Sequence, residues 1–361
     1  IKFANIYNAK FGFVEDNEPQ AAKYGDKTFK RTIYLYDVVN YKILARFADI
    51  KESDIDDIYI ATNIAYKDII KEQLPELPEE NILCEPVGRN TAPCIGLGAV
   101  HIRKKDDDAV MLVLPSDHLI KFEDMYVDVL KEAVKVASEE GSSNLVTLGI
   151  TPNAPETGYG YIKFNTSEKK GSAYTVDRFV EKPDLETAKG YVQSGEYMWN
   201  SGMFAWKIST ILGSMEKHLP DLYKGLLEIE ASIGREDENE VLGRVFEGLA
   251  SESVDYGILE KEQNIYVIPG NFGWDDVGSW LSVERIKERD DNGNVISGNV
   301  AAIGTKDCII EGNKKLIALV GLKDLVVVDT DDATLICSKE KTADIKKVLE
   351  NLRNTDRKEY L

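Results

Sequence analysis

Two acidic segments far apart in the chain carry carboxylates that could together hold a divalent cation. Asp117 lies in the segment LPSDH, directly after an apolar run, and Asp276 lies in GWDDVGSW. An aspartate just beyond the end of a strand can reach over the crevice at that edge of a sheet. Mg²⁺ prefers one or two carboxylates and substrate phosphates as ligands. Asp117 and Asp276 are therefore candidate Mg²⁺ ligands; the alternatives are a helix cap or turn at Asp117 and an exposed acidic turn at Asp276.

A second candidate is the proline- and glycine-containing loop EPVGRNTAP, which starts at Glu85. Its Arg89 and Asn90 side chains suit recognition of a planar, polar edge, and the N-terminus of the helix expected to follow adds donors for an anion. An ordinary turn is the alternative interpretation of this loop.

Several shorter segments carry polar groups at turns. PETGYGY contains two glycines, Gly158 and Gly160, where backbone could approach a ligand closely. EKPD pairs an acceptor, Glu181, with a cation, Lys182, after a strand-like stretch. WNSGMF and SVDY offer Asn200 and Asp255. Each of these short segments taken alone is more often structural than functional.

The elements that must position these residues alternate between strands and helices. Apolar runs at 57–61, 109–114 and 144–150 predict buried strands, and apolar residues spaced by three and four over 125–138 predict a helix. Further helices are expected over 209–217, 222–233 and 241–249. This order predicts an α/β domain with a mainly parallel sheet, which binds ligands beyond the carboxyl ends of its strands.

The pattern changes near residue 290. Short apolar strands with turn residues between them follow one another, as in NVAAIG, CIIEG, KLIALVGL, LVVVDT and TLICS. No helix is expected before 342–352. We predict the α/β domain over residues 1–291 and a small all-β unit, a short β-helix or meander closed by a helix, over residues 292–361.

Composition narrows the range of functions. The net charge of −19 would repel polyphosphate, so broad nucleic-acid binding is not expected, and an anionic substrate would need local cations. The four cysteines contain no C-x-x-C pair and suggest free thiols in a reducing cytoplasm. No apolar run approaches the ~18–20 residues of a membrane span, so no membrane partner is expected. Motifs for serine or cysteine nucleophiles, zinc proteases and P-loops are absent from the sequence.

Taken in order, these segments resemble the mannose-1-phosphate guanylyltransferases of the sugar nucleotidyltransferase family. The shared set is EPVGRNTAP, LPSDH, TPNAPETGYGYI, EKPD, WNSGMF, SVDYG and GWDDVGSW. The resemblance implies a Rossmann-like nucleotidyltransferase domain with a mainly parallel mixed sheet, followed by a short left-handed β-helix. It also implies transfer of GMP from GTP to mannose 1-phosphate, giving GDP-mannose and pyrophosphate, with Mg²⁺ as cofactor and a cytoplasmic homodimer as the assembly.

The resemblance also assigns roles to residues. Asp117 and Asp276 would hold Mg²⁺ and serve catalysis. The loop residues of the nucleotide site would be Glu85, Arg89, Asn90, Thr91 and Ala92. The sugar phosphate would be bound by Gly158, Tyr159, Glu181, Lys182, Asn200 and Asp255.

The chain departs from the family pattern near its start. The family carries a glycine-rich loop of the kind LAGGxGTRLWP, but residues 6–14 read IYNAKFGFV, with one glycine, and Pro19, Gln20 and Lys23 are only faint remnants of the following segment. Three interpretations follow: a non-catalytic regulatory paralogue that binds a nucleotide sugar, a different mode of nucleotide binding, or a first segment that differs from the natural protein. The intact remaining motifs favour the third. A nucleotidyltransferase for another sugar 1-phosphate is a further alternative.

Overall fold

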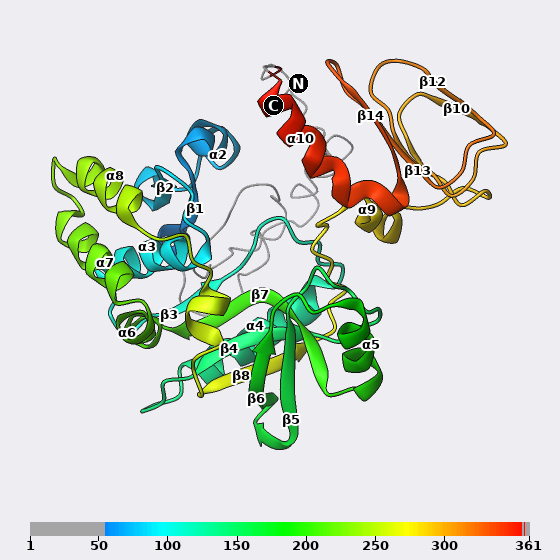
Figure 1. Cartoon of the computed structure of the whole chain (residues 1–361). Helices are drawn as coiled ribbons and strands as arrows, with labels where there is room; N and C mark the ends of the chain where they lie inside the picture. The colour runs from blue at the N-terminus through cyan, green and yellow to red at the C-terminus, as the bar shows by residue number, and fades with distance from the viewer. Residues whose placement is uncertain (1–54, 356, 358–361) are drawn as a thin grey trace, which may run out of the picture. The chain divides into compact units, whose positions relative to one another are not determined.

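A computed structural model describes residues 55–355 and residue 357 (Figure 1). These residues fall into two compact units that divide between Trp274 and Asp275, here called the first unit (55–274) and the second unit (275–357). Residues 6–14 and 19–23, where the sequence lacks the glycine-rich loop, lie outside the described residues.

The centre of the first unit is a six-stranded mixed sheet in the order β3-β7-β4-β8-β6-β5. β7 is antiparallel to β3, β4 and β5, whereas β4 and β8 are parallel. The predicted mixed sheet is therefore confirmed, but most of its described pairings are antiparallel, because β7 lies between β3 and β4. The strands are β3 (Val110–Val113), β4 (Leu145–Ile150), β5 (Tyr161–Lys170), β6 (Ala173–Val180), β7 (Tyr197–Lys207) and β8 (Ile265–Gly270).

A separate pair of parallel strands, β1 (Ile60–Asn63) and β2 (Ile82–Glu85), precedes this sheet in the chain and is joined by α2 (Lys67–Gln73). The predicted helix over 125–138 is confirmed as α4, and those over 209–217, 222–233 and 241–249 as α6, α7 and α8. The helices that follow β2 are α3 (Thr91–Arg103), α4 (Glu123–Ala137), α5 (Leu185–Ser194), α6 (Ile208–His218), α7 (Pro220–Ser232), α8 (Glu238–Gly248) and the π-helix η7 (Asp255–Leu259).

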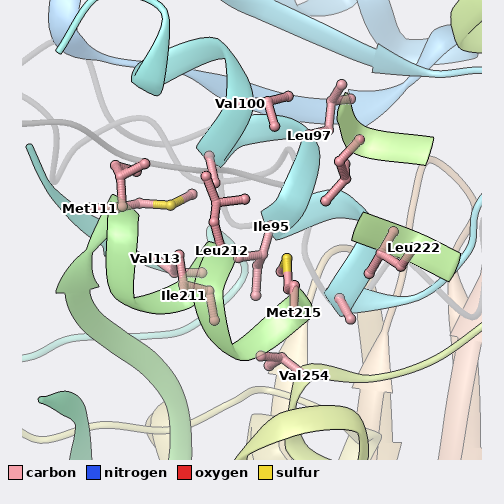
Figure 2. Packing of buried hydrophobic residues seen from close by; sticks show 14 of the residues in the cluster. Ile95, Leu97, Val100, Met111, Val113, Ile211, Leu212, Met215, Leu222 and Val254 are labelled. Atoms are coloured by element: carbon pink, nitrogen blue, oxygen red, sulfur yellow. The ribbon is translucent and has the colours of Figure 1, made fainter. Parts of the chain in front are cut away.

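Strands β3, β4 and β7 are buried on both faces of the sheet along most of their length, and successive residues of a strand point to opposite faces. Leu112 of β3 packs in a buried cluster with residues of α4, whereas its neighbours Met111 and Val113 pack with residues of α3, α6 and α7. Figure 2 shows this second cluster, where Ile95 of α3 and Ile211 of α6 lie close to the β3 side chains. Burial on two sides explains why the strands read as continuous apolar runs.

The second unit begins with α9 (Trp280–Ile286) and continues as short strands. β9, β11 and β13 pair in parallel, β14 pairs antiparallel with β13, and β10 pairs in parallel with β12. A 3₁₀ turn (Lys339–Asp344) leads into the last helix. The elements are β9 (Val295–Ser297), β10 (Val300–Ile303), β11 (Ile309–Glu311), β12 (Ile317–Val320), β13 (Leu325–Asp329), β14 (Thr334–Ser338) and α10 (Ile345–Asn354).

The strands of the second unit wind as a β-helix in which β9 and β11 pair 14 residues apart and the later coils repeat every 17 residues. Ile309 pairs with Val326, and Val300 pairs with Ile317, so the same spacing recurs on two sides of the coil. A bridge between Lys306 and Lys323 repeats it at a third position. The predicted β-helix closed by a helix is therefore confirmed. The inside of the coil is filled by Cys308, Ile310, Leu319 and Val327.

The compact units divide before the change in sequence pattern that suggested a boundary near Asn292. The physical reason is that α9 packs on the β-helix: its Trp280 and Val283 share a buried cluster with Val295, Ile309 and Val326. Within β11 and β13, residues such as Ile309 and Val326 point out of the coil and are buried beneath α9.

Two further sequence expectations concern the whole chain. Cys84, Cys94, Cys308 and Cys337 are free thiols, as predicted. None of the helices within the described residues combines the length and the apolar character that crossing a membrane would require.

Candidate active site

Asn200 lies at an irregularity of the central sheet. The register between β4 and β7 shifts between Thr147 and Gly149, and Asn200 stands opposite Gly149. Two residues on, Gly202 adopts a φ of 70° and donates its backbone N–H to Asn200 Oδ1 at 3.2 Å. Such interruptions re-aim a side chain out of the regular pleat. The small residues of WNSGMF therefore serve to turn the Asn200 amide away from the strand pattern.

Asp255 is the first residue of η7, and its carboxylate accepts a hydrogen bond from Asn200 Nδ2 at 2.7 Å. The side chain is partly buried. Burial, and secondly the neighbouring Glu181 carboxylate, raise the pKa of Asp255 to about 6, against the opposing effects of Asn200 and Lys182. π-Helical turns are rare in proteins as a whole, but those that occur are often found at functional sites. Asn200 and Asp255, two of the predicted sugar-phosphate residues, are thus hydrogen-bonded to each other at such a turn.

Glu181 and Lys182 follow the end of β6 and lie beside this pair. Lys182 Nζ donates to Glu181 Oε1 at 2.7 Å, and the lysine side chain is 62% exposed while that of Glu181 is 15% exposed. Lys182 has a φ of 45°, which is strained for a residue with a Cβ. The Glu181 hydrogen bond and the nearby Asp255 raise the pKa of Lys182, so the ammonium stays charged.

The two glycines of PETGYGY have different surroundings. A Cβ on Gly160 would lie 2.4 Å from Glu181 Oε2, so a side chain at this position would displace the Glu181 carboxylate. Nothing lies within 4 Å of the equivalent point on the exposed Gly158, which is open to solvent. Gly158 is thus the one of the two glycines where a ligand could approach the backbone, and such binding stays a prediction.

An aromatic cluster connects three of the predicted segments within the first unit. The Tyr159 ring contacts the rings of Trp199 and Trp274 edge-on, at centroid distances of 5.1 and 5.3 Å. Trp274 in turn donates its indole N–H to His118 Nδ1 at 3.0 Å. Sequence analysis did not select Trp274 or His118 as site residues; the only available signal was their position beside Asp275 and Asp117, respectively.

Asp117 follows β3 by a few residues, at the position the sequence predicted. Its side chain is 49% exposed, and its Oδ1 lies 3.8 Å from His118 Nε2. Within the residues that the structure describes, no cluster of three or more His, Cys, Asp and Glu side chains is placed to hold a metal ion. An accessible carboxylate oxygen suits Mg²⁺, which takes one or two protein carboxylates when phosphates supply other ligands. Asp117 therefore fits the metal expected from the sequence.

The adjacent aspartates of GWDDVGSW have different partners inside the second unit. Asp275 accepts from Arg285 Nε at 2.7 Å and from the backbone N–H of Val277 at 2.8 Å. Asp276 accepts from the backbone N–H of Gly278 at 3.0 Å, beside Val277 at a φ of 46°. Asp275 thus has a structural role, whereas the contact of Asp276 with Gly278 lies within its own turn. Because Asp276 and Asp117 belong to different units, their joint binding of a metal stays a prediction.

The loop after β2 is anchored by its own polar groups. Arg89 Nε donates to the carbonyl of Phe246, and Arg89 also donates to the carbonyl of Glu247, at the C-terminal end of α8. Cations are favoured at this end of a helix. Asn90, with a φ of 72°, caps α3 by accepting from the Thr91 N–H at 2.8 Å. Contacts of Arg89 and Asn90 with a nucleotide stay a prediction, and the contacts observed here are structural.

The same loop is hydrogen-bonded to the segment that leads into Asp255. Thr91 Oγ1 accepts from the Val254 N–H at 2.9 Å, the Ala92 N–H donates to the carbonyl of Glu252, and the Glu252 N–H donates to the carbonyl of Arg89. Glu85, at the end of β2, is partly buried. The predicted nucleotide loop and the predicted sugar-phosphate residue Asp255 are therefore linked through backbone contacts.

Comparisons with known proteins agree with this architecture. A family model described as "Nucleotidyl transferase" matches residues 38–293, and one described as "MannoseP isomerase/GMP-like beta-helix domain" matches residues 298–352. The chain is 38% identical over 312 residues to "Mannose-1-phosphate guanylyltransferase" of Klebsiella pneumoniae and 40% identical over 313 residues to that of Salmonella montevideo. These alignments cover 85% and 84% of this chain, and 66% and 65% of the relatives.

A solved structure from Thermus thermophilus, described as "mannose-1-phosphate geranyltransferase", has a similar fold. Its TM-score is 0.76 at 27% identity, and the match covers 90% of this chain and all of the other. The chain is thus similar over 90% of its length to a solved protein, although it spans less than two thirds of the curated relatives' own length.

Proposed function

The chain belongs to the nucleotidyl transferase family, and from this premise we propose that it transfers GMP from GTP to mannose 1-phosphate, releasing pyrophosphate and forming GDP-mannose. The observation that carries the proposal is the cluster of Asn200, Asp255, Glu181 and Lys182, whose side chains lie together at the end of β6 and beside β7. The curated relatives named for this reaction support the choice of sugar and nucleotide.

The cluster has the chemistry that a sugar phosphate requires. Lys182 is a charged, exposed ammonium in a chain whose net charge of −19 would otherwise repel an anion. Glu181 can accept hydrogen bonds from sugar hydroxyls, and the Asn200 amide can both donate and accept. We assign Lys182 to the phosphate, and Glu181 and Asn200 to the sugar.

The proposed reaction is an in-line displacement. A phosphate oxygen of mannose 1-phosphate attacks the α-phosphorus of GTP, a P–O bond forms, and the bond to the pyrophosphate leaving group breaks. The attacking oxygen is already anionic at neutral pH, so no side chain need act as a base. The protein contributes by holding the two substrates in line and by placing Lys182 near the phosphate charge.

Mg²⁺, when bound, would neutralise phosphate charge that develops during the displacement. Asp117 offers an accessible carboxylate for it, and Asp276 is the second carboxylate that we assign to this role. Arg89, Asn90, Thr91 and Ala92 are assigned to the nucleotide side, where Asn90 and Thr91 are also exposed.

We also propose a homodimer formed through the second unit. Ile303 and Val320 lie opposite each other on the paired strands β10 and β12, and each is 70% exposed. Leu316, directly before β12, is 61% exposed. Exposed apolar side chains grouped on one sheet indicate a contact surface, and a second copy of the chain would cover it. Light scattering should give the dimer mass at micromolar concentration; a monomer mass there would overturn this assignment.

The test of the activity is pyrophosphate release from GTP and mannose 1-phosphate with Mg²⁺, using the whole chain with its own first segment. We expect turnover that is lost in Asp117→Ala. Absence of turnover in a folded chain would overturn the proposal.

The unusual residues 6–14 favour one competing function, a nucleotide-sugar-binding regulatory subunit. Calorimetry with GDP-mannose distinguishes it, because such a subunit would bind the nucleotide sugar without pyrophosphate release. Turnover with glucose 1-phosphate in place of mannose 1-phosphate would instead point to a different sugar.

A further inference from the structure

The orientation of the Asn200 side-chain amide is defined by three contacts. Its Nδ2 donates to Asp255 Oδ1 at 2.7 Å, and its Oδ1 accepts from Thr147 Oγ1 at 3.3 Å and from the Gly202 N–H at 3.2 Å. A carboxylate only accepts and a backbone N–H only donates. A rotation that exchanged the amide oxygen and nitrogen would therefore break the contacts with both Asp255 and Gly202.

Asp255 is itself fixed from several sides. The residue before it, Val254, donates its N–H to Thr91 Oγ1 and is fully buried. Two residues later, a Cβ on Gly257 would lie 2.9 Å from Leu219 Cδ1 and 3.0 Å from Glu252 Cγ, so the π-helical turn packs without spare room. The position of Asp255 is thus set by the fold rather than by a ligand.

The charged form of Asp255 is disfavoured by its burial, and its hydrogen bond with Asn200 needs only an acceptor, not a charge. The Glu181 carboxylate lies nearby and raises the pKa of Asp255 further, and Lys182 is the nearby cation. An asparagine at position 255 could accept the same hydrogen bond without adding a second anion beside Glu181. Unfavourable placements such as a buried carboxylate beside another carboxylate occur most often at functional sites.

We propose that Asp255 is a positioning residue, which holds the Asn200 amide in one orientation toward the sugar phosphate. This inference deepens the proposed function and rests on it. Asp255 itself need not touch the substrate, because its effect passes through Asn200. The hydrogen-bonded amide then presents its remaining N–H and its oxygen in fixed directions, which reduces the ordering that substrate binding must supply.

The test is steady-state kinetics on three variants, Asp255→Ala, Asn200→Ala and the double variant. We expect Asp255→Ala to raise the KM for mannose 1-phosphate about tenfold, as for the loss of one charge-assisted hydrogen bond, with the KM for GTP little changed. In the Asn200→Ala background the same substitution should add almost nothing, since the residue acts through the amide. Asp255→Asn, which keeps an acceptor, should restore much of the affinity.

A matched control exists in the second unit, where Asn313 Nδ2 donates to Asp331 Oδ1 at 3.1 Å on the surface. Asp331→Ala removes the same kind of contact and should leave both KM values unchanged. Equal increases in both KM values for Asp255→Ala, or effects of Asp255→Ala and Asn200→Ala that simply add, would overturn the positioning role.

The outcome for Asp255 can be separated from that of the proposed function. If the unaltered chain releases no pyrophosphate, the proposed function fails, and calorimetric binding of mannose 1-phosphate by the same variants takes the place of KM. Non-additive losses of affinity would then still support the positioning role, and additive losses would overturn it.

Discussion

The two units use strained backbone in different ways. In the second unit, Asp307 and Asp324 have φ values of 52° and 54° and lie one 17-residue repeat apart, at equivalent corners of the β-helix. In the first unit, Asn90 and Lys182 have φ values of 72° and 45° in unrelated loops, each beside a polar contact. The strained residues of the β-helix recur at the same position of successive coils. Those of the first unit lie in the segments that the sequence analysis named as candidate binding sites.

This difference shows that a positive φ in a residue with a Cβ is not by itself a sign of function. Where the strain repeats with the architecture, the fold alone explains it. Where it occurs once, beside groups that could bind a ligand, a functional explanation is justified. Val277 is a case between these two: it lies in the second unit but next to Asp276, outside the repeating coils.

The largest expected effect tests whether the second unit takes part in the chemistry. Asp276→Ala should lower turnover at least ~10²-fold, as for the loss of a group that stabilises transition-state charge. Asp291→Ala, an exposed aspartate of the same unit, should leave turnover unchanged. Initial rates of pyrophosphate release measure both, and full activity in Asp276→Ala would remove this residue from the metal assignment and confine the site to the first unit.

A pair of glycine substitutions compares the two kinds of strain directly. Lys182→Gly and Asp324→Gly should each gain up to about 1 kcal/mol by relief of the positive φ, less a small loss of exposed ion pairs. Turnover should fall about tenfold or more only in Lys182→Gly, because only that variant loses a charge aimed at phosphate. Thermal unfolding and initial rates give the two quantities. Unchanged turnover in Lys182→Gly would show that the positive φ of Lys182 is a feature of the fold alone, like that of Asp324.

The last expected effect concerns stability alone and is the cost of the charged Asp255. Its pKa is raised in the folded state from 3.8 to about 6, so the stabilising contribution is complete below about pH 4 and is lost as the pH rises through 6. Asp255→Asn should therefore be more stable than the unaltered chain at pH 8, by about 1–2 kcal/mol once partial exposure is allowed for.

Urea unfolding at pH 8 and at pH 4 checks this expectation, with the exposed Asp331→Asn as the reference variant. The advantage of Asp255→Asn should disappear at pH 4. A constant difference at both pH values would show that the gain comes from packing and not from the buried charge.

Much of the architecture was predictable because its signals are local. Apolar runs identified β3 and β4, helical spacing identified α4, and recurring short strands identified the β-helix. The segments carrying Glu181, Lys182 and Asn200 could be selected only through the resemblance of the ordered set to a known family, because each short segment alone is more often structural than functional. A period of apolar residues reports which face of an element is buried, and this information is contained in a few consecutive positions.

The sequence by itself determined the two kinds of domain and the residue types available for a sugar-phosphate site; the tertiary structure decided how those residues are used. It placed the Arg89 guanidinium on carbonyls of α8, 157 residues along the chain, and joined Asn200 to Asp255 across 55 residues. It also paired His118 with Trp274. The reason is physical: a hydrogen-bond partner is set by which elements pack together, and no local periodicity encodes that choice.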